Sequence, residues 1–258
     1  MKLISLNIWG GKKFKPLINF IKDNSKDTDI FCFQEIFDTD SNINESAGFR
    51  LNIYNDISRL LPNHHRYFAS CVENYITGSF QPNFIDFNLS WGLAIFINKK
   101  LKVVSNGDFF VFKKSGTFNP KDLNSLPRNA QYLSFTKDNK KFTVCNLHGI
   151  WQSDGKKDSP SRISQSNKIN KFLGKQKGEK ILCGDLNLDI NTQSIKILEK
   201  NMSNLIKNYN ISTTRSKFFP GNDKFADYTF VSSGVNVIDF KVPNIDVSDH
   251  LPMILEFS

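Results

Sequence analysis

Residues 181–189 have the sequence ILCGDLNLD. The three apolar residues at its start are typical of a buried strand, which Gly184 would end. Asp185, Asn187 and Asp189 then place oxygen-bearing side chains at alternate positions, and a sheet that ends in this way can hold a hard metal ion or a phosphate. Strand alternation would point Asp185 and Asn187 to one side, although the same residue types also form ordinary turns.

The composition indicates a globular protein with a sizeable core. The chain has 258 residues, of which 39% are hydrophobic, and 24 of them are phenylalanine. No apolar run is long enough to span a bilayer, and residues 1–11 alternate like a strand and lack the features of a signal peptide. We therefore predict one domain over residues 1–258, with no stable membrane insertion.

The cysteines and the net charge bear on location and partners. Cys32, Cys145 and Cys183 lie inside apolar runs, Cys71 closes another, and no CxxC pair occurs. This pattern favours buried thiols in a reducing compartment, and hence a cytoplasmic protein. A formal charge of +9 favours polyanionic partners such as nucleic acid, but the lysines are spread along the chain and the support is modest.

Strands outnumber helices in the hydrophobic pattern. Helices are predicted at residues 16–24, 45–61, 161–174 and 192–200. Strands are predicted at residues 2–8, 29–34, 66–71, 92–98, 103–112, 130–136, 141–147, 179–183, 227–232, 235–242 and 251–257. Residues 113–126 are predicted to be a loop, and residues 73–90 a loop or a loose hairpin. This order indicates mixed sheets covered by helices.

Polar side chains lie at the ends of several of the predicted strands. They are Asn7, Glu35, His148, Asp185 and Asn187, and Asp249 and His250 precede the last strand. Each has an ordinary structural explanation when it is considered alone, such as a turn cap, a surface carboxylate or a core histidine. Their repeated position at strand ends favours one shared site.

Six motifs then define a resemblance. LNIWGG, QEIFD, NLHGIW, GDLNLD, ADYTFV and SDHLPM extend from Asn7 to His250. In this order they resemble the endonuclease/exonuclease/phosphatase superfamily, which has the DNase I-like fold; GDxN followed by SDH is the specific part. The resemblance implies an α/β (α+β) four-layer sandwich, with two mixed β-sheets packed face to face and helices on both outer faces.

The resemblance also implies roles at a metal site. Glu35 would be the main ligand of a Mg²⁺ ion, with Mn²⁺ as the alternative, and Asn7 and Asp249 would lie close to that metal. Asp185 would orient or deprotonate the attacking water. Asn187 would contact a phosphate oxygen.

Further implied roles concern the histidines and the arginines. His250 would contact the phosphate while Asp227 holds it as an imidazolium. His148 would be the general acid, where apurinic-site endonucleases have a tyrosine; this role suits a group that titrates near neutrality. Arg128 and Arg162 could reach the substrate phosphate, although a solvated strand or helix end explains each of them too.

Two tryptophans follow the motifs. Trp9 and Trp151 could stack on a base or line a lipid or sugar pocket. Burial in the core is the favoured interpretation of both.

The predicted function is a Mg²⁺-dependent phosphodiester hydrolase, and first of all a monomeric nuclease that cleaves DNA or RNA by metal-assisted attack of water. The alternative is a lipid or small-molecule phosphoesterase, either sphingomyelinase-like or an inositol-phosphate phosphatase. Trp9-Gly10 after Asn7 is favourable to this alternative, because the same pair resembles that of sphingomyelinase-like members. Residues 76–87 could form the membrane hairpin of such an enzyme. The third hypothesis is a catalytically silent nucleic-acid-binding protein, and the intact catalytic motifs argue against it. The two loops, 73–90 and 113–126, are predicted to decide specificity.

Overall fold

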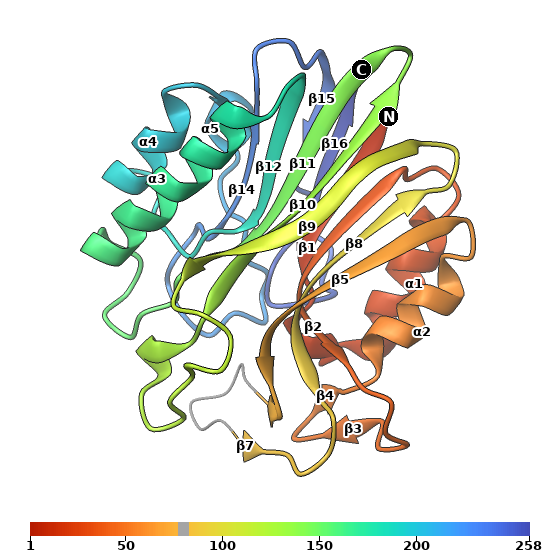
Figure 1. The fold of residues 1–258 in the computed structure, drawn as a ribbon, viewed down its shortest axis with the longest axis vertical. Helices are drawn as coiled ribbons and strands as arrows, with labels where there is room; N and C mark the ends of the chain where they lie inside the picture. The colour runs from red at the N-terminus through yellow and green to blue at the C-terminus, as the bar shows by residue number, and fades with distance from the viewer. Residues whose placement is uncertain (77–82) are drawn as a thin grey trace.

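The computed structural model describes residues 1–76 and 83–258, and Figure 1 shows two β-sheets packed against each other. The first sheet contains, in spatial order, β15 (Val237–Lys241), β16 (Met253–Phe257), β1 (Lys2–Asn7), β2 (Ile30–Asp38), β8 (Ser90–Asn98) and β5 (His64–Glu73). The second contains β13 (Ser203–Asn204), β14 (Asp227–Val231), β12 (Glu179–Asp185), β11 (Lys140–His148), β10 (Arg128–Lys137) and β9 (Lys102–Phe112).

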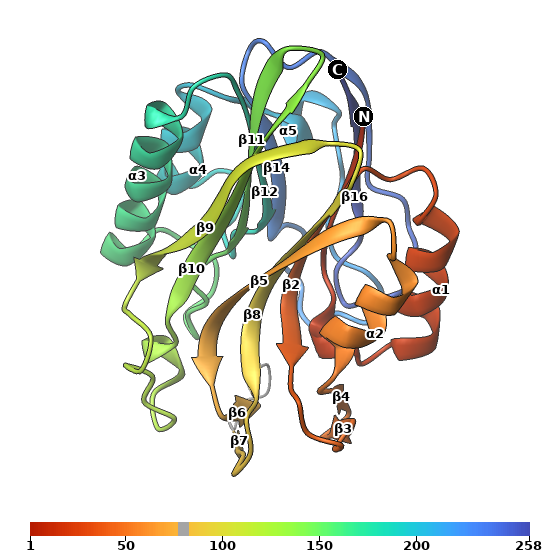
Figure 2. The same ribbon diagram turned by 45° about the vertical axis from the view of Figure 1, so that its right-hand side comes forward.

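Helices form the two outer layers. They are α1 (Phe14–Asn24) and α2 (Ile53–Leu60) on the first sheet, and α3 (Pro160–Lys175), α4 (Gln193–Glu199) and α5 (Leu205–Asn208) on the second (Figures 1 and 2). Two short 3₁₀ turns are η1 (Trp9–Gly11) and η2 (Leu123–Ser125). β1–β2 and β11–β12 are parallel and the other neighbours are antiparallel, so both sheets are mixed. The predicted four-layer sandwich is confirmed.

Alternation along β1 supplies both apolar layers of the first sheet. Leu3 faces the second sheet, whereas Ile4 and Leu6 pack in the cluster that contains the inner faces of α1 and α2. All three side chains are buried. Successive side chains of a strand point to opposite faces, so apolar residues of β1 reach both layers. Full burial of each such side chain contributes about 1.5–3 kcal/mol to stability, which favours covering both faces of the strand.

The interface between the sheets becomes polar toward the strand ends. Gln34 Nε2 on β2 donates to Asn146 Oδ1 on β11 at 2.6 Å, and Asn146 Nδ2 donates to the Phe33 carbonyl at 3.0 Å. Buried polar groups need such partners, because an unmet hydrogen bond in the interior costs about 1–3 kcal/mol. These bonds connect the two sheets where their polar strand ends meet.

One predicted helix is wrong in its first half. Residues 45–50 form the short strands β3 (Glu45–Ser46) and β4 (Phe49–Arg50), and only the second half is helical, as α2. Ala47 and Gly48 have φ values of 51° and 78°, which turn the chain between the two strands.

Other segments agree with the sequence pattern. Asp138 and Asn139, at φ 49° and 62°, form the predicted turn between β10 and β11. All four cysteines are free and buried. β6 (Tyr75–Ile76) pairs with β7 (Asn83–Phe84), which confirms a hairpin there, although residues 77–82 of the predicted specificity loop and membrane hairpin lie outside the described residues. No helix in the described part of the chain is long and apolar enough to cross a bilayer.

Candidate active site

Strand register places three of the predicted site residues side by side. His148 on β11 is opposite Asp185 on the parallel strand β12, and Asp185 is opposite Asp227 on the antiparallel strand β14. Gly184 precedes Asp185 with φ of +132°, and a Cβ atom there would lie 2.1 Å from the Leu147 carbonyl oxygen. Only glycine therefore lets β12 approach β11 closely at this point.

The first sheet contributes the opposite side of the site. Glu35 lies at a β-bulge between Gln34 and Ile36, with φ of 56°. A bulge redirects the side chain of the inserted residue. Asn7 Nδ2 donates to Glu35 Oε1 at 3.0 Å and to Asp185 Oδ2 at 3.1 Å, so one amide joins carboxylates from both sheets.

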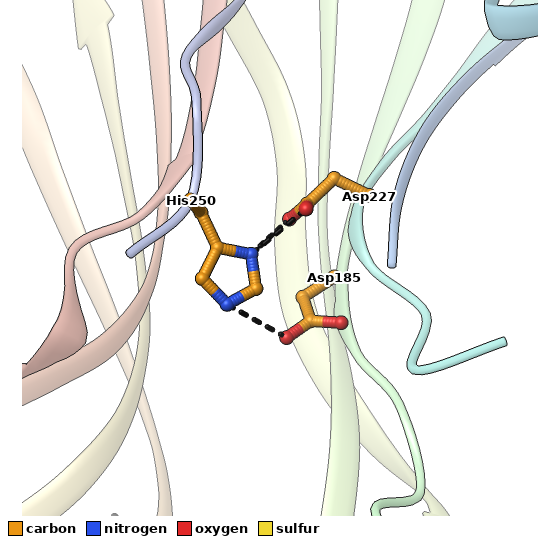
Figure 3. Close-up of side chains that lie close together, drawn as sticks. All are labelled: Asp185, Asp227 and His250. Carbon is orange, nitrogen blue, oxygen red and sulfur yellow. Dashed lines mark hydrogen bonds and ion pairs between the residues drawn. The ribbon is translucent and has the colours of Figure 1, made fainter. Parts of the chain in front are cut away.

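The ring of His250 lies between two carboxylates, as Figure 3 shows. Its Nδ1 atom is 2.9 and 2.8 Å from the two oxygens of Asp227, and its Nε2 atom is 3.6 Å from Asp185 Oδ2. Burial and Arg215 lower the pKa of His250, but Asp227, Asp249 and Asp185 outweigh them and the pKa is raised. The Asp227 pair therefore favours the imidazolium form.

His148 is placed against the same cluster but has the opposite tendency. Its Nε2 atom lies 3.7 Å from both Asp185 Oδ2 and Glu35 Oε1, and Arg128 Nη1 lies 3.4 Å from its Nδ1 atom. Burial and the charge of Arg128 hold the pKa of His148 well below its ordinary value. A neutral ring at neutral pH gives no support to the predicted role of His148 as general acid.

Asp185 is ionised at neutral pH. Burial raises its pKa, but the positive charges of His250, Lys156 and Arg215 outweigh burial and hold the pKa below its ordinary value. A carboxylate of low pKa orients a water molecule better than it removes a proton from one. The geometry thus favours the orienting role over deprotonation.

Asn187 reaches the cluster through a turn. β12 ends at Asp185, and Asn187 has φ of 53°, so strand alternation does not continue through it. Its Nδ2 atom donates to the Gly149 carbonyl at 3.3 Å, and Lys156 Nζ donates to its Oδ1 atom at 3.1 Å. These contacts hold the amide at the cluster.

Oxygen donors for a metal ion gather around Glu35. Burial raises the pKa of Glu35, and the negative charge of Asp249 raises it further. A divalent cation would offset this repulsion, and the carboxylate oxygens of Glu35 and Asp249 are of the kind that Mg²⁺ prefers. Asn7 lies beside Glu35, but its Nδ2 atom faces that carboxylate and its Oδ1 atom accepts from the Trp9 N–H. The residues present therefore fit the metal that the sequence implies.

A second group could surround an ion by distance alone. Ligand atoms of Asp185, Asp227 and His250 all lie within 4.8 Å of one another. Asp227 favours the imidazolium form of His250, however, and an imidazolium has no free lone pair with which to bind a metal ion. We therefore favour Glu35 and its neighbours as the metal ligands.

The two predicted phosphate arginines have different surroundings. Arg128 lies at the cluster, is 3% exposed, and has a buried Nε atom that finds no hydrogen-bond partner in the described part of the chain. Arg162 has other partners than the cluster. Its Nε, Nη1 and Nη2 atoms donate to the carbonyls of Ile150, Lys157 and Gly155 at 3.2, 2.6 and 2.7 Å, respectively. Arg162 therefore holds the loop after β11 in shape, and we do not assign it a phosphate.

Neither motif tryptophan is in the core. Trp9 and Trp151 are both partly exposed, so the predicted burial is wrong for both. The Trp9 backbone N–H donates to Asn7 Oδ1 at 3.0 Å, which holds Trp9 at the rim of the cluster.

Two cations at the cluster lack a sequence signal. Arg215 Nη1 contacts His250 Nε2 and lies 3.6 Å from Asp249 Oδ2, and Lys156 contacts Asn187. Lys156 is one of two adjacent lysines, and Arg215 occurs in a polar run, TTRSK. Both lie on loops, where no periodicity predicts the direction of a side chain.

The fold and this cluster define a phosphoester hydrolase with a DNase I-like fold. The model of the Endonuclease/Exonuclease/phosphatase family matches residues 4–250, so the chain belongs to this family. Members of the family are phosphoester hydrolases, generally metal-dependent, and the protein is an enzyme of this class. No protein with a curated description matches the sequence significantly.

Solved structures share the whole fold. A mannosyl-6-phosphatase of Bacteroides thetaiotaomicron VPI-5482 is 19% identical with a TM-score of 0.71, and the match covers 100% of this chain and 99% of that chain. A family protein of Leptotrichia buccalis C-1013-b is 17% identical with a TM-score of 0.69, covering 100% and 99%. The human nocturnin catalytic domain with bound sulfate is 16% identical with a TM-score of 0.69, covering 100% and 94%. These identities establish the shared fold.

Proposed function

We propose that the protein is a Mg²⁺-dependent phosphodiester hydrolase and that nucleic acid is its substrate. The observation that carries this proposal is the meeting of Asp185, the His250–Asp227 pair and Glu35 at one point between the two sheets. Together these groups can orient a water molecule, stabilise negative charge and hold a metal ion.

Each group has one task in this proposal. Asp185 orients the attacking water, and His250, charged through its contact with Asp227, faces the phosphoryl oxygens and stabilises the charge that develops on them. Asn187, held by Lys156, donates to a phosphate oxygen. Mg²⁺ held by Glu35 and Asp249, with Asn7 next to Glu35, would neutralise the non-bridging and leaving oxygens.

The rim of the cluster supports nucleic acid as the substrate. Lys12 Nζ lies 4.5 Å from the centre of the Trp9 ring, and Lys13 Nζ lies 4.0 Å from the centre of the Phe218 ring. These ammonium groups can contact the phosphates of a nucleic acid, and the rings beneath them keep them in place. The net charge of +9 supports the same partner.

A second candidate is a small-molecule or lipid phosphoesterase. The residues at the centre of the cluster are almost enclosed, with Asp185 2%, His250 3% and His148 5% exposed. Such low exposure also suits a single phosphate group on a sugar, an inositol or a lipid head group.

A substrate panel separates the two candidates. We would assay supercoiled plasmid, single-stranded RNA, abasic duplex, sphingomyelin and a sugar phosphate with Mg²⁺ and with EDTA. Cleavage of nucleic acid that EDTA abolishes, and that Asp185→Asn reduces about 10²–10⁴-fold, is the expected result. Asp189→Asn, an exposed aspartate four residues further on, should keep wild-type activity.

Release of phosphate or phosphocholine without nucleic-acid cleavage would overturn the nuclease assignment in favour of the second candidate. Hydrolysis of nucleic acid that persists in EDTA and in Asp185→Asn would contradict the proposed mechanism.

A further inference from the structure

Arg215 is held beside the site by its backbone. It lies on the loop between α5 and β14, and it forms an isolated antiparallel bridge with His250. The N–H of the next residue, Ser216, donates to the Asp249 carbonyl at 3.1 Å. Residues opposite each other in an antiparallel pair project to the same side, so the bridge directs the guanidinium toward the ring of His250.

The guanidinium has more donors than partners. The Arg215 side chain is 8% exposed, and its Cζ atom lies 4.1 Å from the centre of the Phe219 ring. Nη1 contacts His250 Nε2 and approaches Asp249 Oδ2 at 3.6 Å, whereas Nε is buried and has no hydrogen-bond partner among the described residues. A buried donor without a partner is costly, which indicates that a ligand completes the arrangement.

Arg162 shows how this chain treats an arginine with a structural task. Its three nitrogens all donate to loop carbonyls at 2.6–3.2 Å. Arg215 instead faces a histidine nitrogen and a more distant carboxylate, both of which belong to the candidate active site. The contrast marks Arg215 as a residue that receives an anion.

We propose that Arg215 binds a non-bridging oxygen of the substrate's phosphoryl group, next to His250. This inference rests on the proposed function, because it concerns the same site, and it names the group that this side of the site recognises. The planar fork of a guanidinium matches two oxygens of a phosphate, and the ring of Phe219 on one face keeps the fork oriented. On binding, a phosphoryl oxygen would accept from Nη1, which now lies against the ring nitrogen Nε2 of His250.

Binding of inorganic phosphate tests this proposal without turnover. We would titrate orthophosphate into metal-free wild type, Arg215→Gln and Lys224→Gln in EDTA and measure affinity by calorimetry. Lys224 is exposed on the same loop and serves as the matched control. Arg215→Gln should bind phosphate at least about tenfold more weakly, as expected for loss of a charge-assisted bond, and Lys224→Gln should bind like the wild type.

The wild-type protein provides a measurement that does not depend on how the variant folds. In an NMR spectrum of ¹⁵N-labelled protein, the Nε–H signal of Arg215, assigned by its absence from Arg215→Lys, should shift as phosphate saturates the site. An unshifted signal at saturation, or equal phosphate affinity of wild type and folded Arg215→Gln, would overturn the proposal.

Kinetics separate this proposal from the proposed function. On whichever phosphoester the wild type hydrolyses, Arg215→Gln should lower kcat/KM about 10²–10³-fold, and Lys224→Gln should not. If the wild type hydrolyses no phosphoester, the proposed function fails, and the phosphate titration still decides whether Arg215 binds the anion. If the wild type is active and Arg215→Gln retains its kcat/KM, only the inference about Arg215 fails.

Discussion

The ammonium group of Lys156 is buried beside Asn187, and its charge affects stability. Burial, helped by Arg215, lowers the pKa of Lys156 to about 8. An unfolded lysine titrates near a pKa of about 10.4, so between about pH 8 and pH 10.4 the unfolded chain binds more protons than the folded one. The contribution of Lys156 to the free energy of unfolding therefore rises with pH across this window.

Substitution of Lys156 should reveal this effect. We expect Lys156→Met to raise the free energy of unfolding near pH 7 by at most about 3 kcal/mol, because the folded protein no longer contains this buried charge. Loss of the hydrogen bond to Asn187 should reduce this gain by about 1 kcal/mol. The gain should shrink as the pH approaches about 10, where the folded lysine is already neutral. Urea unfolding at both pH values measures it, with exposed Lys157→Met as the control. Equal pH dependence in Lys156→Met and wild type would contradict the prediction.

The Asp227–His250 pair allows a second prediction about a single residue. Asp227 is the first of the three carboxylates that raise the pKa of His250 against burial and Arg215. Asp227→Asn removes that charge, so the pKa of His250 should fall and the imidazolium should be lost at a lower pH than in the wild type. NMR titration of the ring measures the shift, and Asp223→Asn, at an exposed position, should leave it unchanged. An unaltered His250 titration in Asp227→Asn would show that this pair does not set the charge.

Residues at strand ends could be predicted from the sequence, and residues on loops could not. Asn7, Glu35 and Asp185 directly follow apolar strand patterns, and the structure brings them together. The contacts of Arg162 and Arg215 could not be predicted in this way, because they depend on which groups the folded loops place around each guanidinium. The catalytic and metal-binding roles of the cluster remain predictions until the variants are assayed.

At the level of elements, the approach of β12 to β11 depends on Gly184. A Cβ atom would lie 2.1 Å from the Leu147 carbonyl oxygen, and φ of +132° is unfavourable for other residues. We expect Gly184→Ala to lower the free energy of unfolding by about 1–3 kcal/mol or more and to reduce activity, because Asp185 follows directly.

Gly174 provides the matched control for this substitution. It lies in α3, where an added Cβ would have no atom of the described residues within 4 Å. Gly174→Ala should be neutral or stabilising by up to about 1 kcal/mol, since alanine favours the helix. Thermal and urea unfolding of the two variants measure the difference, and similar effects of both would contradict this account of Gly184.

Elements with a clear hydrophobic pattern were predictable, and short ones were not. The apolar run GLAIFIN predicts the strand β8, since both faces of a buried strand meet an apolar layer. The segment before α2 contains apolar residues at helical spacing, but Ala47 and Gly48 turn it into a β3–β4 hairpin. Two-residue strands contain too few side chains to establish a period, so a neighbouring helix pattern extends over them.

At the scale of the whole molecule, the candidate active site is built from both sheets. Glu35 comes from the first sheet and Asp185 from the second, and Asn7 connects their carboxylates. A cation bound at Glu35 would therefore stabilise the packing of one sheet on the other. A ligand that binds only the folded state stabilises it by about 2.7 kcal/mol at a concentration 100 times its Kd.

Thermal unfolding tests this coupling between metal and fold. Mg²⁺ should raise the Tm of wild type relative to EDTA, and Glu35→Gln should show a smaller rise, because it lacks the main carboxylate. Glu45→Gln, at an exposed position, should respond like the wild type. The same Mg²⁺ response in Glu35→Gln and wild type would show that the ion binds elsewhere.

The sequence by itself determined the class of fold and the identity of the strand-end polar residues. It could do so because strand alternation and the motifs at strand ends are local features of the chain. Only the tertiary structure decided that Arg162 holds a loop, that His148 is kept neutral and that Arg215 and Lys156 meet the cluster. Those outcomes depend on burial and on charges brought together from distant parts of the chain, and no local pattern contains either.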